Sequence, residues 1–284
     1  MNQPDKGQNQ YMWSAESRQW RLIYDSPTHV ALNMARDEAL LESVAASPPT
    51  LRFYYWNPPC LSLGYGQKAR DVDFERVAAY GWDVVRRPTG GRAILHTDEL
   101  TYSVTLPLTH PLASGSIIES YHRISSALLA GLRLLDIAPQ AERAERRAAG
   151  QAPICFEVAS HYEITVNGRK LVGSAQARRK GGLLQHGTLP LCGDITRICD
   201  ALRYPDEAAR QSAKAQVGAR AITLADALNG QAVTWQQAAE AIAQGFAQTF
   251  GITFIIDSYS PHENQRADEL RATVYRNHES IIAK

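Results

Sequence analysis

A cysteine and a lysine in the middle of this sequence have the types and the setting for covalent acyl chemistry. Cys155 lies in the segment PICFEVAS, and Lys170 follows the dipeptide Asn167-Gly168. A free thiol has a pKa near about 8.5 and is roughly 3% ionised at pH 7, and a nearby ammonium raises that fraction by lowering the thiol pKa. We therefore interpret Cys155 as a candidate nucleophile and Lys170 as its candidate activator. The alternative, which spacing alone favours, is a buried cysteine and a solvated hairpin lysine.

The dipeptide Asn167-Gly168 predicts how Lys170 is positioned. Asn-Gly between two apolar runs is the strongest short hairpin signal, because a type I′ turn needs positive φ at both central positions. A two-residue turn also fixes the register of the flanking strands. The expected pairs are Val166 with Arg169, Thr165 with Lys170 and Ile164 with Leu171. In this register Lys170 projects away from the aliphatic face of the hairpin.

The segment RRPTGGRAILH carries a second chemical signal. Arg86, Arg87 and Arg92 surround the pair Gly90-Gly91, an arrangement suited to bringing backbone N–H and guanidinium groups near a carbonyl, carboxylate or phosphate. The segment matches neither the GxxxxGK[ST] phosphate loop nor the GxGxxG dinucleotide fingerprint. A tight turn with solvated arginines is the alternative interpretation.

Two histidines on predicted strands, His96 and His186, could orient an acyl group or a carrier. A lone histidine on a strand is more often held by ordinary hydrogen bonds, and this alternative stays open. A thiol hydrolase built on Cys155 and His161 has no supporting motif in the sequence.

Hydrophobic periodicity supplies the elements that must position these residues. Apolar residues at helical spacing predict helices over 28–46 and 117–135, and Thr234 and Gly251 delimit a third helix. Shorter helices are expected at 71–81 and 194–204, with a polar helix at the C-terminal end. Strands are expected at 20–24, 51–56, 60–66, on both sides of the glycine pair, in the hairpin, at 181–191 and at 252–257. We predict an α+β fold with mixed, largely antiparallel sheets flanked by helices.

Composition narrows the class of protein. Lys plus Arg total 30 and Asp plus Glu total 29 over 284 residues, so no excess charge favours a nucleic acid or a membrane surface as partner. The cysteines Cys60, Cys155, Cys192 and Cys199 form no CxxC pair, which argues against zinc and against a disulfide framework. All but Cys155 are interpreted as structural. The polar N-terminus and the absence of long apolar runs predict a cytoplasmic protein.

Taken together, RRPTGGRAILHTDELTYSV and ICFEVASHYEITVNGRKLVGSAQARRKGGLLQHGTLPL resemble the lipoate-protein ligase A and octanoyltransferase branch of the biotin/lipoate ligase superfamily. The resemblance includes WRLIYD, ALNMARDEALL and LRFYYWNPPCLSLGYGQ, and it implies the biotin/lipoate ligase catalytic-domain fold. GRKLVGSAQ looks like the family's lysine motif, which implies that Lys170 contacts the acyl group. ICFEVASHYE is similar to the cysteine segment of one octanoyltransferase type, which implies that Cys155 carries the acyl thioester. The expected domains are a disordered leader over 1–19, the catalytic domain over 20–255 and a helical appendage over 256–284.

The resemblance implies transfer of octanoate from octanoyl-acyl carrier protein to Cys155, and then to a lysine of the glycine cleavage H protein or another lipoyl domain. No cofactor, metal, nucleic acid or membrane is expected, and the enzyme is predicted to be a monomer. The expected substrate-binding residues are Arg87, Gly90, Gly91, Arg92, His96, Gly173, Ser174, Ala175, His186 and Gly187.

Three other functions remain open at this stage. In an ATP-dependent lipoate ligase Cys155 would be incidental, because free lipoate must be activated as an adenylate. An amidotransferase would use the cysteine to move octanoyl groups between lipoyl domains. A non-catalytic module would keep the fold and only bind an acyl group or a carrier. A biotin ligase is disfavoured, because no basic DNA-binding module precedes the catalytic region.

Overall fold

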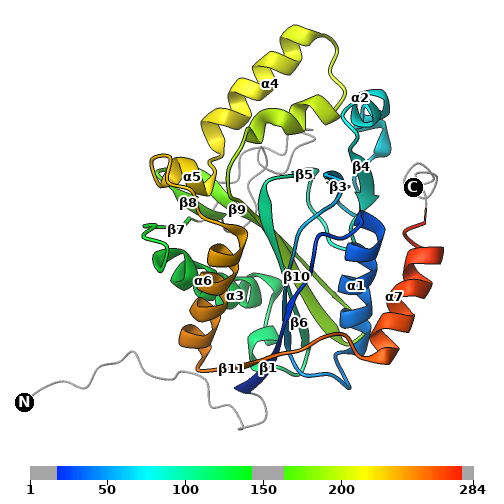
Figure 1. The fold of residues 1–284 in the computed structure, drawn as a ribbon, viewed down its shortest axis with the longest axis vertical. Helices are drawn as coiled ribbons and strands as arrows, with labels where there is room; N and C mark the ends of the chain where they lie inside the picture. The colour runs from blue at the N-terminus through cyan, green and yellow to red at the C-terminus, as the bar shows by residue number, and fades with distance from the viewer. Residues whose placement is uncertain (1–17, 143–162, 277–284) are drawn as a thin grey trace, which may run out of the picture.

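The computed structural model describes residues 18–142 and 163–276, and these residues form one large and one small β-sheet (Figure 1). The large sheet has eight strands in the order β11-β1-β2-β6-β10-β9-β8-β7, and the small sheet has three in the order β4-β3-β5. The strands of the large sheet are β1 (Gln19–Tyr24), β2 (Thr50–Tyr54), β6 (Glu99–Pro107), β7 (Gln140–Glu142), β8 (Glu163–Val166), β9 (Arg169–Arg179), β10 (Gly182–Pro190) and β11 (Thr253–Ile256). Those of the small sheet are β3 (Cys60–Leu63), β4 (Asp83–Arg86) and β5 (Ile94–His96).

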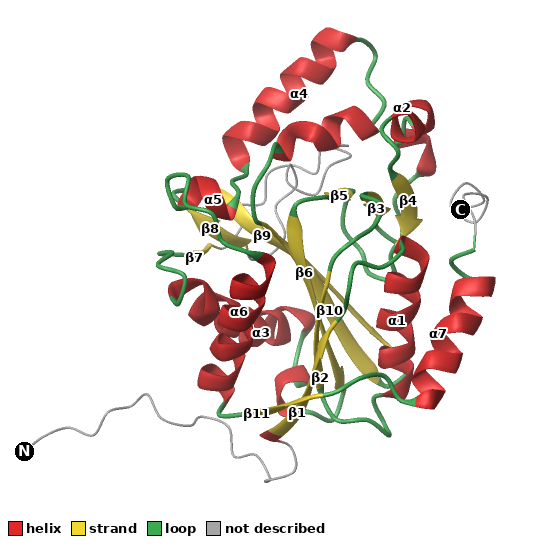
Figure 2. Ribbon diagram, viewed as in Figure 1, coloured by secondary structure: helices red, strands yellow, loops and turns green. Residues whose placement is uncertain are grey.

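Helices cover both faces of the large sheet (Figure 2). α3 and α6 pack against each other on one face, and α1 lies on the other face with α7 packed on its outer side. The α-helices are α1 (Val30–Ser43), α2 (Phe74–Ala79), α3 (Ile117–Arg133), α4 (Glu207–Arg220), α5 (Leu224–Ala227), α6 (Trp235–Phe250) and α7 (Pro261–Thr273). Short 3₁₀ helices are η2 (Ala69–Asp71), η3 (Pro111–Ala113) and η4 (Ile195–Ala201).

Strand pairing confirms the predicted fold class. From β2 through β6, β10, β9 and β8 to β7, each strand of the large sheet is antiparallel to the next, and β5 is antiparallel to β3 in the small sheet. Parallel pairing occurs where β1 lies between β2 and β11, and where β3 pairs with β4. The described chain is thus a mixed α+β fold with mostly antiparallel sheets flanked by helices.

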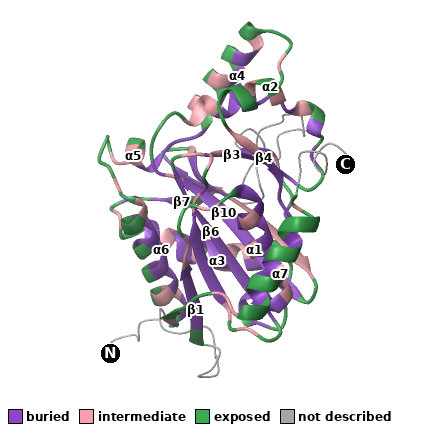
Figure 3. Ribbon diagram, turned by 45° about the vertical axis from the view of Figure 1, so that its right-hand side comes forward, coloured by how far each residue is buried: buried purple, intermediate pink, exposed green. Residues whose placement is uncertain are grey.

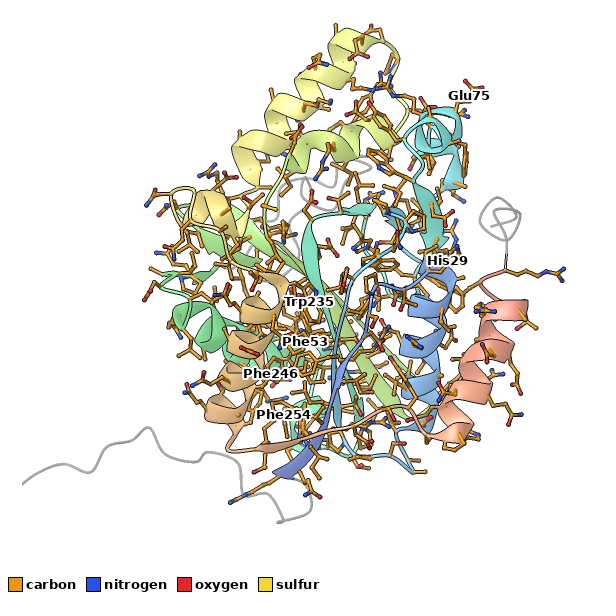
Figure 4. The ribbon with its side chains drawn as sticks, in the orientation of Figure 1. His29, Phe53, Glu75, Trp235, Phe246 and Phe254 are labelled. Carbon is orange, nitrogen blue, oxygen red and sulfur yellow. The ribbon has the colours of Figure 1, made fainter. Side chains whose placement is uncertain are left out.

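The two central strands of the large sheet are buried on both faces, as the purple ribbon in Figure 3 shows. Every residue of β6 and β10 except the last is buried, because α1 covers one face and α3 and α6 cover the other. The core on the α6 side contains a cluster of aromatic rings. Trp20 lies beside Phe246 and Phe254, which are labelled in Figure 4, at centroid distances of 6.3 and 6.4 Å. Burial on both faces explains why these strands read as nearly continuous apolar runs.

The helix boundaries follow the predicted capping residues. Thr234 caps α6, in a capping box with Gln237, and Gly251 ends that helix in the left-handed region at φ 62°. Ser116 forms a second capping box with Glu119 at the start of α3. The predicted roles of Thr234 and Gly251 are therefore confirmed.

The hairpin turn at Asn167-Gly168 is confirmed, with φ values of 51° and 72°. Val166 pairs with Arg169 and Thr165 with Lys170, as expected. The third predicted pair was wrong, because a β-bulge shifts the register and Ile164 faces Val172 instead of Leu171. An extra residue in one strand cannot be recognised from alternation alone.

The structure adds detail that the sequence did not predict. β4 and β5 flank the glycine pair, as expected, and both pair with β3 instead of with each other. The short helix predicted over 194–204 is present as the 3₁₀ helix η4 over Ile195–Ala201, and α4 and α5 were not predicted. No described helix is long and apolar enough to span a membrane. The leader falls almost wholly outside the described residues, and the three-part domain division remains a prediction.

Candidate functional site

A small pocket lies between α1, the small sheet and the face of the large sheet that α1 covers. Five of the predicted substrate-binding residues line it, namely Arg87, His96, Ala175, His186 and Gly187. The other lining residues are Met34, Tyr54, Trp56, Ser62, Ile94, Thr101 and Thr188. Half of its lining residues are polar or charged, but the surface that they expose in the pocket is mostly apolar.

Arg87 organises the glycine loop from within the protein. Its guanidinium donates to the carbonyl of Gly90 at 2.8 Å, to that of Arg92 at 2.7 Å and to that of Ser62 at 3.0 Å. Arg86 is also buried and donates to the carbonyls of residues 64, 65 and 67, and burial lowers the pKa of its guanidinium. The interpretation of these two arginines as solvated is therefore wrong. Both serve to fix the loops that border the pocket.

Two glycine loops touch at the edge of this region. A Cβ atom on Gly64 would lie 1.9 Å from the carbonyl oxygen of Gly91, closer than any side chain allows. Gly91 has φ 93°, and the backbone N–H of Tyr65 donates to the carbonyl of Thr89 at 2.9 Å. Glycine at position 64 is thus required by the close approach of two backbones.

His96 lies in a chain of hydrogen bonds that reaches the pocket. Its Nδ1 is 2.6 Å from Glu99 Oε1, and its Nε2 is 2.8 Å from Ser62 Oγ. The ring stacks on Trp56 with a centroid distance of 4.2 Å. Thr101 and Thr188 donate hydrogen bonds to the two oxygens of Glu99. The imidazole is therefore held in a fixed orientation.

His186 forms a second buried chain. Its Nδ1 is 3.0 Å from Asp37 Oδ2, and its Nε2 is 2.6 Å from Thr89 Oγ1. Burial lowers the pKa of His186, although Asp37 acts in the opposite direction. Burial would raise the pKa of Asp37, but Arg52 and His186 more than offset it and the net change is downward. Both shifts favour a neutral imidazole on His186 beside an ionised carboxylate on Asp37. The chain from Asp37 through His186 to Thr89 links α1 to the glycine loop.

Lys170 is buried beside the pocket, with 2% of its surface exposed. Its Nζ donates to Glu163 Oε1 at 2.9 Å across the hairpin. A Cβ atom built on Gly173 would lie 3.7 Å from Cε of Lys170 and 3.8 Å from the methyl group of Thr188. Lys170 is therefore close to Thr188, which lines the pocket. The interpretation of Lys170 as a solvated hairpin lysine is therefore wrong.

Cys155 lies outside the described residues, so its distance from Lys170 stays a prediction. Of the other cysteines, Cys60 and Cys199 are buried and Cys192 is exposed. Burial raises the pKa of the Cys60 thiol well above its usual value, which keeps that sulfur protonated and unreactive. The structural interpretation thus fits Cys60 and Cys199, whereas Cys192 is not part of the core.

The remaining predicted residues do not line the pocket. Gly90 and Gly91 are exposed on the loop, and Arg92 is partly exposed. The hydroxyl of Ser174 lies 2.7 Å from that of Tyr102, on the opposite face of the sheet from the pocket. For these residues a substrate contact through the backbone or from the loop remains a prediction.

Sequence reasoning missed several polar residues of the site, namely Asp37, Ser62, Glu99, Glu163 and Thr188. One signal was available for Asp37. It lies within the apolar face of the helix predicted over 28–46, where a carboxylate is expected only if it is paired. Among residues 18–142 and 163–276, no cluster of His, Cys, Asp or Glu is suited to hold a metal ion.

The fold is an α+β domain with a small pocket between its two sheets, and comparison with known proteins assigns the family. Residues 29–247 match the lipoyl protein ligase A/B catalytic domain, so the chain belongs to that family, as its sequence predicts. Two relatives named Octanoyltransferase LipM are each 42% identical to this chain. The one from Kyrpidia tusciae covers 89% of this chain and 95% of its own length, and the one from Symbiobacterium thermophilum covers 90% and 95%.

Solved structures of lipoate-protein ligases share this fold. A bi-partite lipoate protein ligase from Thermoplasma acidophilum superposes with a TM-score of 0.78 at 25% identity, over 93% of this chain and 96% of that one. A lipoate-protein ligase A bound with ATP superposes with a TM-score of 0.76 at 25% identity, over 93% and 98%. The predicted biotin/lipoate ligase catalytic-domain fold is confirmed.

Proposed function

We propose that this chain is an octanoyltransferase of lipoate biosynthesis that carries the octanoyl group on Cys155 as a thioester. The proposal follows the relatives, which bear this activity in their name and align over almost their whole length. Octanoyl-acyl carrier protein is the proposed donor. A lysine of the glycine cleavage H protein or of another lipoyl domain is the proposed acceptor.

The observation that carries the proposal is the burial of Lys170 beside a largely apolar pocket. A buried ammonium is costly unless anions surround it, and Glu163 is one such anion. A thiolate at Cys155 would be a second. In this arrangement Lys170 lowers the thiol pKa and stabilises the oxyanion that develops during acyl transfer.

The energetics of this route need no ATP. The donor is already a thioester, so transfer to Cys155 exchanges one thioester for another, and the final amide is more stable than either. Free lipoate would need activation first. Neither a cofactor nor a metal enters this reaction.

Intact mass spectrometry tests the proposed intermediate. After mixing with octanoyl-acyl carrier protein, the protein should gain one octanoyl group that hydroxylamine removes, and Cys155→Ser should gain none. A matched control is Cys192→Ser, which changes an exposed cysteine and should leave the adduct intact. If wild type gains no adduct but modifies an apo lipoyl domain with lipoate and ATP, the protein is a ligase. An adduct that passes between lipoyl domains but is not accepted from the carrier protein indicates an amidotransferase.

The role of Lys170 is tested by the rate of Cys155 alkylation as a function of pH. In Lys170→Ala the thiol pKa should rise towards about 8.5, the value of a free cysteine. An unchanged thiol pKa in that variant rejects the role of Lys170 as activator. The cytoplasmic location and the monomeric state are also predictions, and size-exclusion chromatography with light scattering checks the latter.

A further inference from the structure

The proposed transfer to a lysine raises a proton problem. A lysine with a pKa near about 10.4 is neutral only about four times in ten thousand at pH 7, and its nitrogen must lose a further proton as the amide forms. Lys170 is a poor base for this step, because its Nζ donates to the carboxylate of Glu163, which favours the protonated ammonium. A proton acceptor is needed elsewhere in the pocket.

We propose that Ser62, His96 and Glu99 form a proton relay that accepts a proton from the acceptor amine. The proposal rests on the octanoyltransferase function proposed above. Ser62 and His96 both line the pocket, and Glu99 lies behind His96. The three groups are joined by distances of 2.8 and 2.6 Å, with the imidazole between the hydroxyl and the carboxylate.

The surrounding hydrogen bonds fix the direction of the relay. The carboxylate of Glu99 accepts from Thr101 and Thr188, so we assign it as ionised and accepting from His96 Nδ1–H as well. This tautomer leaves Nε2 of His96 as an acceptor, and the hydroxyl of Ser62 donates to it. The relay therefore runs from Ser62 to His96, and Glu99 stabilises the imidazolium that results.

The oxygen of Ser62 has room for one more hydrogen bond. It has two lone pairs, and Nη1 of Arg87 donates to one of them at 3.1 Å. Ser62 is buried at the wall of the pocket, and the relay requires that an N–H of the entering amine reach the other lone pair. The charge of Arg87 makes the hydroxyl of Ser62 more acidic, which favours release of its proton to His96.

The relay lies close to Lys170. Thr188 donates to Glu99, and its methyl group and Cε of Lys170 would both lie within 4 Å of a Cβ on Gly173. Lys170 and the relay therefore border the same end of the pocket.

The other histidine in the pocket does not offer this path. Nε2 of His186 is engaged by Thr89, which does not line the pocket. Its chain of hydrogen bonds ends at Thr89 of the glycine loop, which is buried, so the hydroxyl of Thr89 does not face the pocket from which the amine enters. Its role is to hold the loop.

The transfer step balances as follows. The neutral acceptor amine forms a bond from nitrogen to the acyl carbon, and the carbon–sulfur bond breaks with its electron pair leaving on sulfur. One amine proton moves to Ser62 Oγ as the hydroxyl proton moves to Nε2 of His96. The products are the amide, a thiolate and an imidazolium, and the imidazolium then returns its proton to the thiolate or to water.

The experiment separates the two half-reactions. Octanoyl-enzyme is first formed and measured by intact mass, and its transfer to an apo lipoyl domain is then timed. Ser62→Ala should slow the transfer by roughly 10²–10⁴-fold, the range for loss of general base catalysis, while formation of octanoyl-enzyme changes by less than about tenfold. His96→Gln, which keeps a hydrogen-bonding side chain, should show the same split.

A change of nucleophile distinguishes proton transfer from a merely structural role. Hydroxylamine is neutral near pH 7 and far less basic than a lysine, so it depends less on a base. Its attack on octanoyl-enzyme should be slowed by less than about tenfold in Ser62→Ala. The matched control Ser125→Ala changes a buried serine of α3 outside the pocket and should behave as wild type.

Each outcome has a separate meaning. Equal slowing with the lipoyl domain and with hydroxylamine, or equal slowing of both half-reactions, overturns the relay. Wild-type transfer rates in both variants overturn it too. If wild-type protein forms no octanoyl-enzyme at all, the proposed function fails instead. Should Ser62→Ala not fold, as judged by its melting temperature, His96→Gln decides the question.

Discussion

Asp37 offers the sharpest test of how the pocket is held together. Its carboxylate is fully buried on α1 and accepts hydrogen bonds from Arg52 at 2.7 Å, Ser103 at 2.8 Å, Tyr54 at 2.9 Å and His186 at 3.0 Å. Asp37→Asn keeps the shape of the side chain but removes the charge and introduces an NH₂ group facing donors. We expect a large loss of stability.

The magnitude follows from the burial of both partners. Breaking a buried ion pair costs about 3–5 kcal/mol, and the lower end applies because Arg52 keeps a second carboxylate, Asp25, at 2.7 Å. At roughly 2–4 °C per kcal/mol for a chain of this size, a cost of about 3 kcal/mol lowers the melting temperature by about 6–12 °C. Asp268→Asn, an exposed position on α7, should change stability by less than about 0.5 kcal/mol.

The pH dependence has a defined sign. The pKa of Asp37 is lowered on folding, so its contribution is present above the ordinary value near about 3.9 and is lost as the pH falls through the lower folded value. The pKa of His186 is also lowered. Below about pH 6.5 the imidazole of residue 186 therefore takes up a proton in the unfolded chain but stays neutral in the folded protein. The free energy of unfolding falls as the pH decreases from there.

Thermal unfolding by circular dichroism, at about pH 7 and then at stepwise lower pH, measures these effects. A melting temperature of Asp37→Asn within about 2 °C of wild type refutes the reasoning. So does a wild-type stability that rises as the pH is lowered from about 6.5 to 5.

Two other substitutions test separate parts of the site. Gly64→Ala should force the loops at Gly64 and Gly91 apart, lower the stability by about 1–3 kcal/mol and slow octanoyl-enzyme formation. The control Gly66→Ala, at a position with open space around it, should leave stability and rate unchanged. Equal melting temperatures and rates for the two variants count against the close approach. Glu163→Gln and Lys170→Met should each lower the free energy of unfolding. The loss in the double variant should be smaller than the sum of the two single losses by about 0.5–3 kcal/mol, because both variants remove the same ion pair. Strictly additive losses contradict a buried pair.

Local signals in the sequence predicted much of the fold, because the relevant interactions are local. The Asn167-Gly168 turn and the Thr234 cap each depend on a few adjacent residues, and both are present in the structure. The pairing of β4 and β5 with β3 depends on distant segments, so the sequence around the glycine pair could not predict it. The bulge at Ile164 had no local signal either.

The site shows the same division between local and distant information. Arg87, His96 and His186 could be singled out by residue type, and the structure places all three around one pocket. Their partners Ser62 and Asp37 come from segments that the fold brings in from far along the chain. A serine in an apolar run and an aspartate in a helix gave no sign of the histidine each would meet.

The C-terminal segment has a consequence for how this protein tolerates truncation. β11 completes the edge beside β1, and α7 lies along the outer side of α1, where Glu263 forms a buried ion pair with Arg21 of β1 at 2.6 Å. The inner side of α1 carries Asp37. Removing β11 and α7 would take away the outer support of α1, the helix that shapes one wall of the pocket. A shortened chain should therefore lose substrate affinity, although no deleted side chain lines that pocket.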